Sequence, residues 1–157
     1  MSKDIEISEQ EFYEAMLAAA KASIEAFAKK HEDKTFYGFS IETLAEEGYF
    51  QMAFNTEEGL LEIDEKWRED EKWNNQAWAY FDFNQGDEAW NTHWDPMQER
   101  INNLKNESTD RQYAKFMRDF KKASVCVLAE LERINVFDQI KKTDYFKTEV
   151  FEHHDRW

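Results

Sequence analysis

The first regular pattern along the chain is helical. Ser8 is followed three residues later by Glu11, a pairing that satisfies two backbone N–H groups at the start of a helix. Apolar residues then recur at steps of three or four, which places them on one face of a helix. They are Phe12, Met16, Ala20, Ile24 and Phe27. This spacing predicts a helix over residues 9–31.

The next two apolar segments alternate with period two, as strands do. Residues 35–42 place Tyr37, Phe39 and Ile41 on one face of an extended chain, and residues 49–55 alternate in the same way. Only a short polar turn separates the two segments. The pattern therefore predicts an antiparallel hairpin.

A second helix is expected after Asn55, whose side chain is of a type that caps helices. Leu60, Ile63 and Trp67 would form its buried side, and a run of carboxylates would face solvent. Farther along, residues 78–83 (WAYFDF) are short, aromatic and alternating. They predict a third strand.

Two more helices and a strand are expected in the rest of the chain. Asp87 can cap the first helix, and Pro96 interrupts its apolar stripe in a way that allows the helix to restart there. Thr109 and Gln112 form another capping box, which opens the longest helix. Residues 144–152 then alternate as a strand.

Together these elements predict an α+β fold in the order α-β-β-α-β-α-α-β, with an antiparallel sheet of about four strands packed by four or five helices. With 157 residues, no repeat and no linker, we expect a single domain over residues 1–157. Hydrophobic residues make up 41% of the chain and aromatic residues 16%, which excludes disorder. No apolar run is long enough to span a membrane and no signal-peptide pattern is present, so a cytoplasmic location is expected.

The charges are distributed unevenly. The chain has 34 acidic and 20 basic residues, a net charge of −14, yet residues 108–157 are nearly neutral. An acidic surface repels nucleic acid and anionic membranes, and it attracts cationic partners. The charge therefore favours a basic protein partner over nucleic acid or membrane. The alternative is that the acidity serves only solubility.

No motif for catalysis or for a cofactor is present. The four glycines are too far apart for a phosphate-binding loop, and the hydrolase and metalloprotease motifs are absent. His153 and His154 are adjacent, so on an extended chain they would point to opposite faces, and no metal site is expected. Cys126 lies in an apolar helical stretch and is expected to be buried. The many carboxylates leave open an enzymatic or small-molecule site in a cleft.

The predicted contact surface combines aromatic residues with carboxylates. Alternation over residues 78–83 would turn Phe81 toward the core, and Trp78 and Tyr80 outward beside an acidic residue. Exposed aromatic side chains with a polar group are typical of interface hot spots, although ordinary core packing is the alternative. The predicted partner-binding residues are Glu46, Glu47, Glu62, Glu65, Glu69, Trp73, Trp78, Tyr80 and Asp82.

Four segments occur in a recognisable order and spacing. They are residues 31–39 (HEDKTFYGF), residues 55–60 (NTEEGL), Trp73 and residues 78–80 (WAY). The sequence resembles in these segments the bacterial domain-of-unknown-function family numbered 4303, although Glu32 stands where the family tends to have proline and Asn74-Asn75 where it has Ser-Pro. The resemblance covers nearly the whole chain and supplies no catalytic residue. The resemblance implies, for those family members whose genes lie near bacterial toxin systems, an immunity protein that neutralises a cognate toxin.

Overall fold

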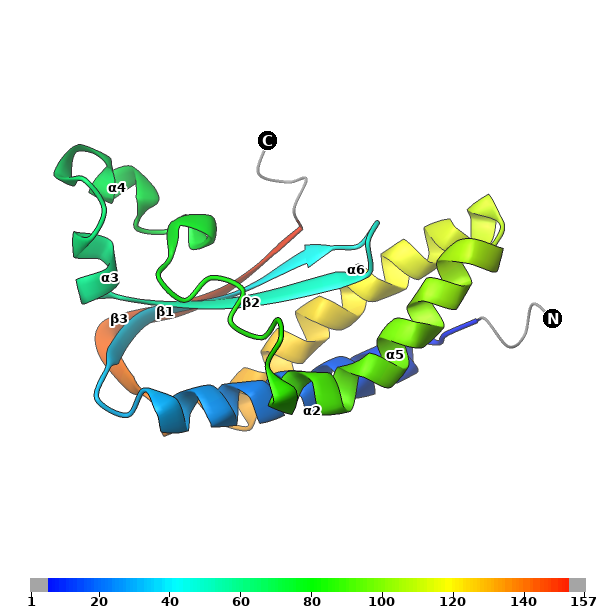
Figure 1. Ribbon diagram of the computed structural model, residues 1–157, viewed down its shortest axis with the longest axis horizontal. Coiled ribbons are helices and arrows are strands. Elements are labelled where there is room, and N and C mark those ends of the chain that lie inside the picture. The colour runs from blue at the N-terminus through cyan, green and yellow to red at the C-terminus, as the bar shows by residue number, and fades with distance from the viewer. Residues whose placement is uncertain (1–5, 153–157) are drawn as a thin grey trace.

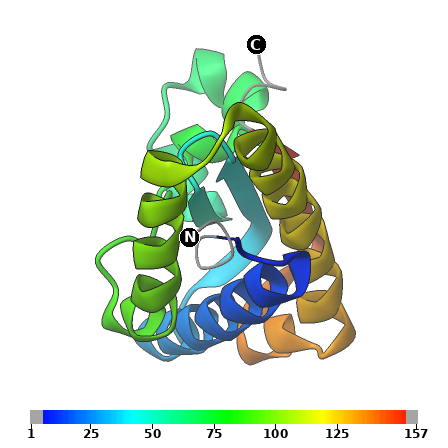
Figure 2. The ribbon, with the colours of Figure 1, turned by 90° about the vertical axis from the view of Figure 1, so that its right-hand side faces the viewer.

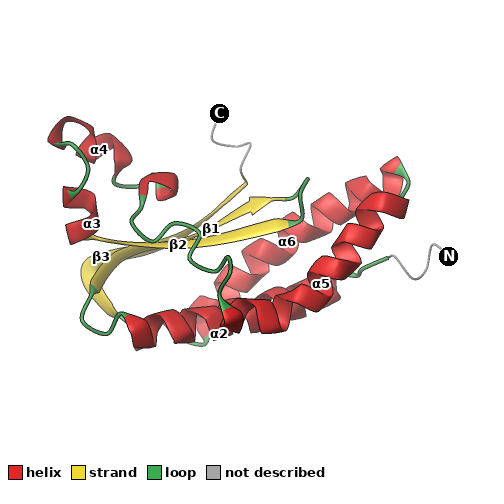
Figure 3. Ribbon diagram, viewed as in Figure 1, coloured by secondary structure: helices red, strands yellow, loops and turns green. Residues whose placement is uncertain are grey.

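Three long helices pack on one face of a three-stranded sheet in the computed structural model, which describes residues 6–152 (Figures 1 and 3). The helices are α2 (Glu9–Lys30), α5 (Glu88–Glu107) and α6 (Asp110–Arg133), and the strands are β1 (Thr35–Leu44), β2 (Tyr49–Thr56) and β3 (Lys141–Glu152). Viewed along the sheet, α5, α2 and α6 surround one side of it (Figure 2). The α+β class is confirmed. None of the described helices is both long and apolar enough to cross a membrane.

The sheet has the order β2-β1-β3. Strands β1 and β2 form the expected antiparallel hairpin, whereas β3 pairs with β1 in parallel. The expectation of a fully antiparallel sheet of about four strands is therefore wrong. Parallel neighbours require a long crossover connection, and here the chain between β1 and β3 includes both α5 and α6.

A register shift between Phe36 and Gly38 changes which side chains share a face of β1. Phe39 and Ile41 face the long helices, but Tyr37 belongs to a separate small core on the other face. The expectation that these three residues share one face fails because an irregularity of this kind adds a residue and reverses the alternation locally.

The main core lies between the sheet and the three helices and is rich in aromatic rings. Phe27 stacks on Phe54 with ring centroids 4.8 Å apart, and Phe50 stacks on Trp90 at 5.5 Å. Helix α5 continues through Pro96, so the expected restart there is wrong. Its buried residues lie on both sides of the proline, and their packing holds the helix together across the lost hydrogen bond. They are Trp90, Trp94, Met97, Ile101 and Leu104.

Residues 78–83 are not a strand, contrary to the sequence prediction. They form turns that bind the free edge of β2 through one bridge, between Phe54 and Tyr80. Just beyond them, the side chain of Asn84 accepts a hydrogen bond from the Met52 N–H at 2.9 Å and donates one to the Phe50 carbonyl at 2.9 Å. This edge of the sheet is thus covered by a side chain that imitates a backbone strand.

The single helix expected after Asn55 is divided into short pieces. These are α3 (Glu57–Leu61), the 3-10 turn η1 (Glu65–Trp67), α4 (Arg68–Glu71) and the 3-10 turn η2 (Asn75–Ala77). The cap of α3 is Thr56, whose hydroxyl accepts from the Gly59 N–H at 2.9 Å. Helix α3 ends at Leu61, so its periodicity does not determine which of the later lobe residues face solvent.

Candidate interaction surface

Residues 57–77, which we call the acidic lobe, project from the sheet on the side opposite α2 (Figure 1). The lobe contains eight acidic and three basic residues. It begins where β2 ends, at the end of the hairpin far from the β1–β2 turn. The acidic lobe is therefore the most strongly charged unit of the fold and lies apart from the main core.

A buried polar network attaches the lobe to the sheet. The Tyr37 hydroxyl and the Trp78 indole N–H both donate to the backbone carbonyl of Lys72, at 2.7 and 2.9 Å. The Asn55 amide donates to the Tyr37 hydroxyl at 2.8 Å, and its oxygen accepts from the Ala79 N–H at 3.1 Å. These bonds fix the exit of the lobe against the sheet and satisfy groups that would be costly to bury unpaired.

Close packing reinforces this attachment at Gly59. A Cβ atom at this position would lie 2.4 Å from Oδ1 of Asn55 and 2.8 Å from Cβ of Ala79. A side chain of any size would therefore separate α3 from the segment that follows Trp78. Glycine is needed here for space rather than for an unusual backbone angle.

The outer side of the lobe exposes two large apolar side chains. Leu61 is 62% exposed and Trp67 is 52% exposed. The Arg68 guanidinium donates to the carbonyls of Ile63 (2.8 Å) and Leu61 (3.0 Å), and so holds the chain where α3 ends. Ile63, Trp67, Glu71 and Ala77 line a shallow depression of about 540 Å³. The lobe thus presents a shaped apolar patch.

Carboxylates outnumber cations on the lobe, although the Lys66 ammonium lies over the Trp67 ring at 5.5 Å. Glu62, Glu65 and Glu69, three of the predicted partner-binding residues, are exposed on the lobe. Trp67 was expected on the buried side of a continuous helix, and that expectation is wrong because the chain breaks at residues 62–64 and resets the helical phase. The one sequence signal of the break is Asp64, which caps η1 by accepting from the Lys66 N–H.

Two of the predicted aromatic contacts, Trp73 within the lobe and Trp78 just after it, pack toward the sheet. Trp78 is only 6% exposed and packs with Tyr37, which corrects the expectation that its face of the segment points outward. Trp73 is half-buried, edge-to-face with Tyr37 at 5.2 Å, and its ring carries the Lys147 ammonium at 4.2 Å. Both residues support the lobe from the sheet side.

The predicted residues Tyr80 and Asp82 lie away from the lobe. Tyr80 is half-buried against the main core, with its ring 5.3 Å from that of Phe27 and 4.8 Å from that of His31. Asp82 accepts a hydrogen bond from the Tyr49 hydroxyl at 2.9 Å. The aromatic segment therefore splits between the two faces of the sheet, and its residues do not form one contact surface.

Glu46 and Glu47 occupy the β1–β2 turn. Glu47 lies 3.3 Å from the Lys105 ammonium, and the Tyr113 hydroxyl donates to the Glu46 carbonyl. Because β1 has ten residues, the turn and the lobe are about 30 Å apart along the strand. The structure does not bring these two glutamates together with those of the lobe.

Tyr49 and Asp82 form a hydrogen-bonded titratable pair in which both pKa values are raised. Burial raises the pKa of Asp82, and burial together with the Asp82 carboxylate raises the pKa of Tyr49 to about 12. A general acid or base works best when its pKa lies near the working pH, and the pKa of Tyr49 lies far above neutral pH. No group of three or more potential metal ligands occurs among the described residues. His153 and His154 lie outside the described residues.

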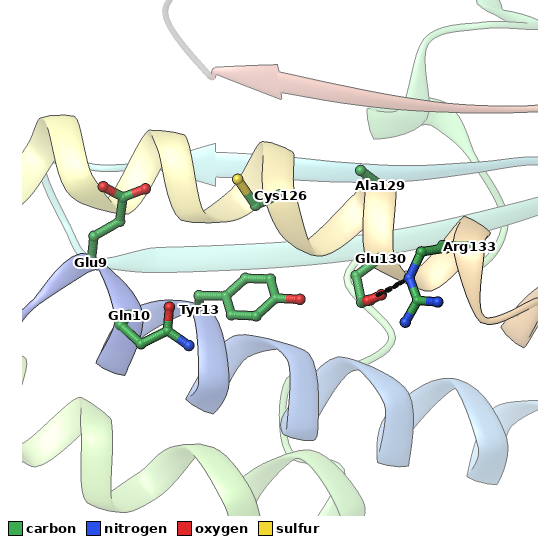
Figure 4. A pocket seen from close by; sticks show the side chains of 7 residues that line it. All are labelled: Glu9, Gln10, Tyr13, Cys126, Ala129, Glu130 and Arg133. Carbon is green, nitrogen blue, oxygen red and sulfur yellow. Dashed lines mark hydrogen bonds and ion pairs between the residues drawn. The ribbon is translucent and has the colours of Figure 1, made fainter.

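Cys126 lies at the surface, in a groove between α2 and α6 (Figure 4), so the expectation of a buried thiol is wrong. The buried stripe of α6 runs through Ala123 and Val127, and Cys126 falls outside it. The groove has a volume of about 720 Å³, and its lining includes the Glu130–Arg133 ion pair but neither histidine nor lysine. The cation of the lining, Arg133, is paired with Glu130 rather than with the thiol.

Residues 16–156 match the model of the family described as "Domain of unknown function (DUF4303)", as the resemblance of the sequence indicated. No curated protein and no solved structure matches the chain.

Proposed function

This chain belongs to the DUF4303 family, and we propose that it is an interaction protein of the immunity type, which neutralises a basic toxin by docking the acidic lobe over the toxin's active cleft. The observation that carries the proposal is the exposure of Trp67 and Leu61 on a lobe in which acidic residues outnumber basic residues by eight to three. Tryptophan is among the residues most enriched at the energetic centres of interfaces. Exposed apolar side chains on a lobe of net negative charge suit a partner of opposite charge.

The two components of the lobe have different roles. The carboxylates attract a basic partner over a distance of about a Debye length, roughly 8–10 Å at physiological salt, and so raise the association rate. Trp67 and Leu61 would then lose their contact with water in the complex and supply most of the affinity. The buried network around Tyr37 holds the patch in place before binding, so little ordering is required on association.

The first step of the test is to inspect the neighbouring genes for a basic toxin domain; the second is to measure binding to that domain and protection of cells that express it. Trp67→Ala should weaken binding by about 30-fold, which corresponds to roughly 2 kcal/mol. Val125→Ala is the matched control, because Val125 is equally exposed (53%) but lies on α6, away from the lobe. Equal affinities for the two variants would contradict the proposal, as would a lack of binding by the unmodified protein.

A further inference from the structure

The two edges of the sheet differ in whether other residues cover them. The β2 edge is covered by residues 80–84, through the bridge at Phe54 and the two hydrogen bonds of the Asn84 side chain. At the other edge, β1 is the only strand that pairs with β3 within the described part of the chain. The β1–β3 ladder is regular from Lys147 to Glu152, after four residues of β3 (143–146) that stand opposite Tyr37 alone. A strand edge with no second partner strand is a template for another strand. From this edge we propose that two copies of the chain associate by antiparallel pairing of their β3 strands.

Symmetry restricts how two β3 strands can pair. A two-fold axis perpendicular to a continuous sheet places the same face of both strands on the same side of the sheet. Because successive side chains alternate between the two faces, residues that lie opposite each other are both odd or both even in number. Lys147 and Glu149 are two residues apart and both exposed or half-exposed at the centre of the strand. With Thr148 opposite its own copy, Lys147 of each protomer lies opposite Glu149 of the other.

Neighbouring registers are unfavourable. Moving the two-fold axis by one residue, which changes the pairing register by two, places Lys147 opposite its own copy or Glu149 opposite its own copy, and like charges directly opposite destabilise a strand pair. Residues 143–146 lie in the irregular part of β3, so the pairing is set by Lys147, Thr148 and Glu149. The charges of Lys147 and Glu149 therefore favour the register centred on Thr148 over its two neighbours.

The overall charge of the chain does not oppose this contact locally. Residues 108–157 carry ten basic and nine acidic side chains, so the excess of negative charge lies elsewhere in the sequence. A single strand edge is smaller than a standard interface, which buries about 800 Å² on each partner. We therefore expect a weak dimer that forms at high protein concentration and dissociates on dilution.

Sedimentation from micromolar to millimolar concentration tests the proposal, with the weight-average mass expected to rise from 18.9 kDa toward twice that value. Glu149→Lys should weaken the dimer by roughly tenfold or more, because both symmetric pairs become like-charged. Lys147→Glu should do the same, and the two single variants mixed together should recover the wild-type strength as a heterodimer. The double variant Lys147→Glu, Glu149→Lys should also recover it.

Two controls keep the result interpretable. Glu99→Lys makes the same charge change at an exposed position on α5 and should leave the dimer unchanged. Lys147 also lies over the Trp73 ring, so thermal unfolding of each variant is measured, and Glu149→Lys is decisive if Lys147→Glu fails to fold. A protein that stays monomeric at every concentration overturns the proposal. So does a dimer that Glu149→Lys leaves intact, because its interface would lie elsewhere.

Discussion

The Tyr37 hydroxyl and the Trp78 indole donate to one acceptor, the carbonyl oxygen of Lys72, at 2.7 and 2.9 Å. One donor comes from β1, the other from the segment that follows the lobe, and the acceptor is within the lobe itself. Strand β1 and the two ends of the segment 72–78, which lies 35 residues farther along the chain, therefore meet at a single oxygen atom. The position of the acidic lobe depends on this meeting point.

Replacing Tyr37 with Phe removes one of the two donors and also leaves the Asn55 amide without its acceptor. We expect the free energy of unfolding to fall by about 1–3 kcal/mol, the usual cost of leaving a buried polar group unsatisfied. Urea denaturation measures this change. Tyr145→Phe removes an exposed hydroxyl that donates to Glu57, and it should cost much less. Equal losses for the two variants would show that the network does not support the fold.

The charge of the lobe should govern how fast a basic partner binds. Reversing Glu62, Glu65 and Glu69 to Lys should slow association and flatten its dependence on salt. Stability should change little, since exposed charges contribute little to it. Stopped-flow association at several salt concentrations gives the rates.

The control for this prediction reverses the same number of charges elsewhere. Glu14, Glu99 and Glu107 are exposed on the long helices, so their reversal changes the net charge equally. If both triple variants slowed association to the same extent, the net charge would be responsible and the lobe would have no special role. An unchanged rate in both would leave only the solubility interpretation of the acidity.

Asp82 should make stability depend on pH. Its folded-state pKa lies above the ordinary value of 3.8, mainly because of burial, so between the two pKa values the folded state binds more protons than the unfolded state. Stability should therefore decrease as the pH rises through this window, and the cost should persist at neutral pH. Asp82 also has a positive φ of 57°, which asparagine tolerates well.

Asp82→Asn should accordingly raise the melting temperature at neutral pH and give no gain below the ordinary aspartate pKa. The amide oxygen can still accept the Tyr49 hydrogen bond. Melting curves of both proteins across the acidic range measure the difference. A gain that is the same at every pH would mean that the backbone angle, rather than the buried charge, is responsible.

The exposure of Cys126 predicts rapid reaction with a thiol reagent in the native protein. Cys126→Ser should change the free energy of unfolding by no more than about 0.5 kcal/mol, as surface substitutions usually do. The labelling rate is compared with that of the unfolded chain. Labelling that requires unfolding would contradict the exposed position.

The elements that the sequence predicted well are those in which local pattern and packing agree. Residues 9–31 and the helix opened by Thr109 each combine a capping box with a long apolar stripe, and the structure contains both boxes. Residues 78–83 have the alternation of a strand, yet their aromatic side chains are divided between two cores by turns. The alternating pattern of these residues shows that side chains on both sides of the segment can be buried. It does not show that the backbone pairs with a neighbouring strand.

The candidate surface was predictable only in part. Glu62, Glu65 and Glu69 could be assigned to solvent from their charge alone. The exposure of Trp67 could not, because its face was inferred by continuing the phase of α3 across residues 62–64, where the helix stops. Cys126 was misplaced for a related reason: an apolar run in α6 is wider than the stripe that the core covers.

The acidic lobe enters and leaves the fold at one place. Asn55 at its beginning accepts a hydrogen bond from Ala79 just after its end, at 3.1 Å, so the intervening residues form a loop closed at its base. The distance between its two ends is fixed by this bond and does not depend on what lies between them. The lobe thus resembles a cassette: its outer residues can be exchanged without altering the sheet and helices that carry it, provided that Gly59 and the Lys72 carbonyl stay in place.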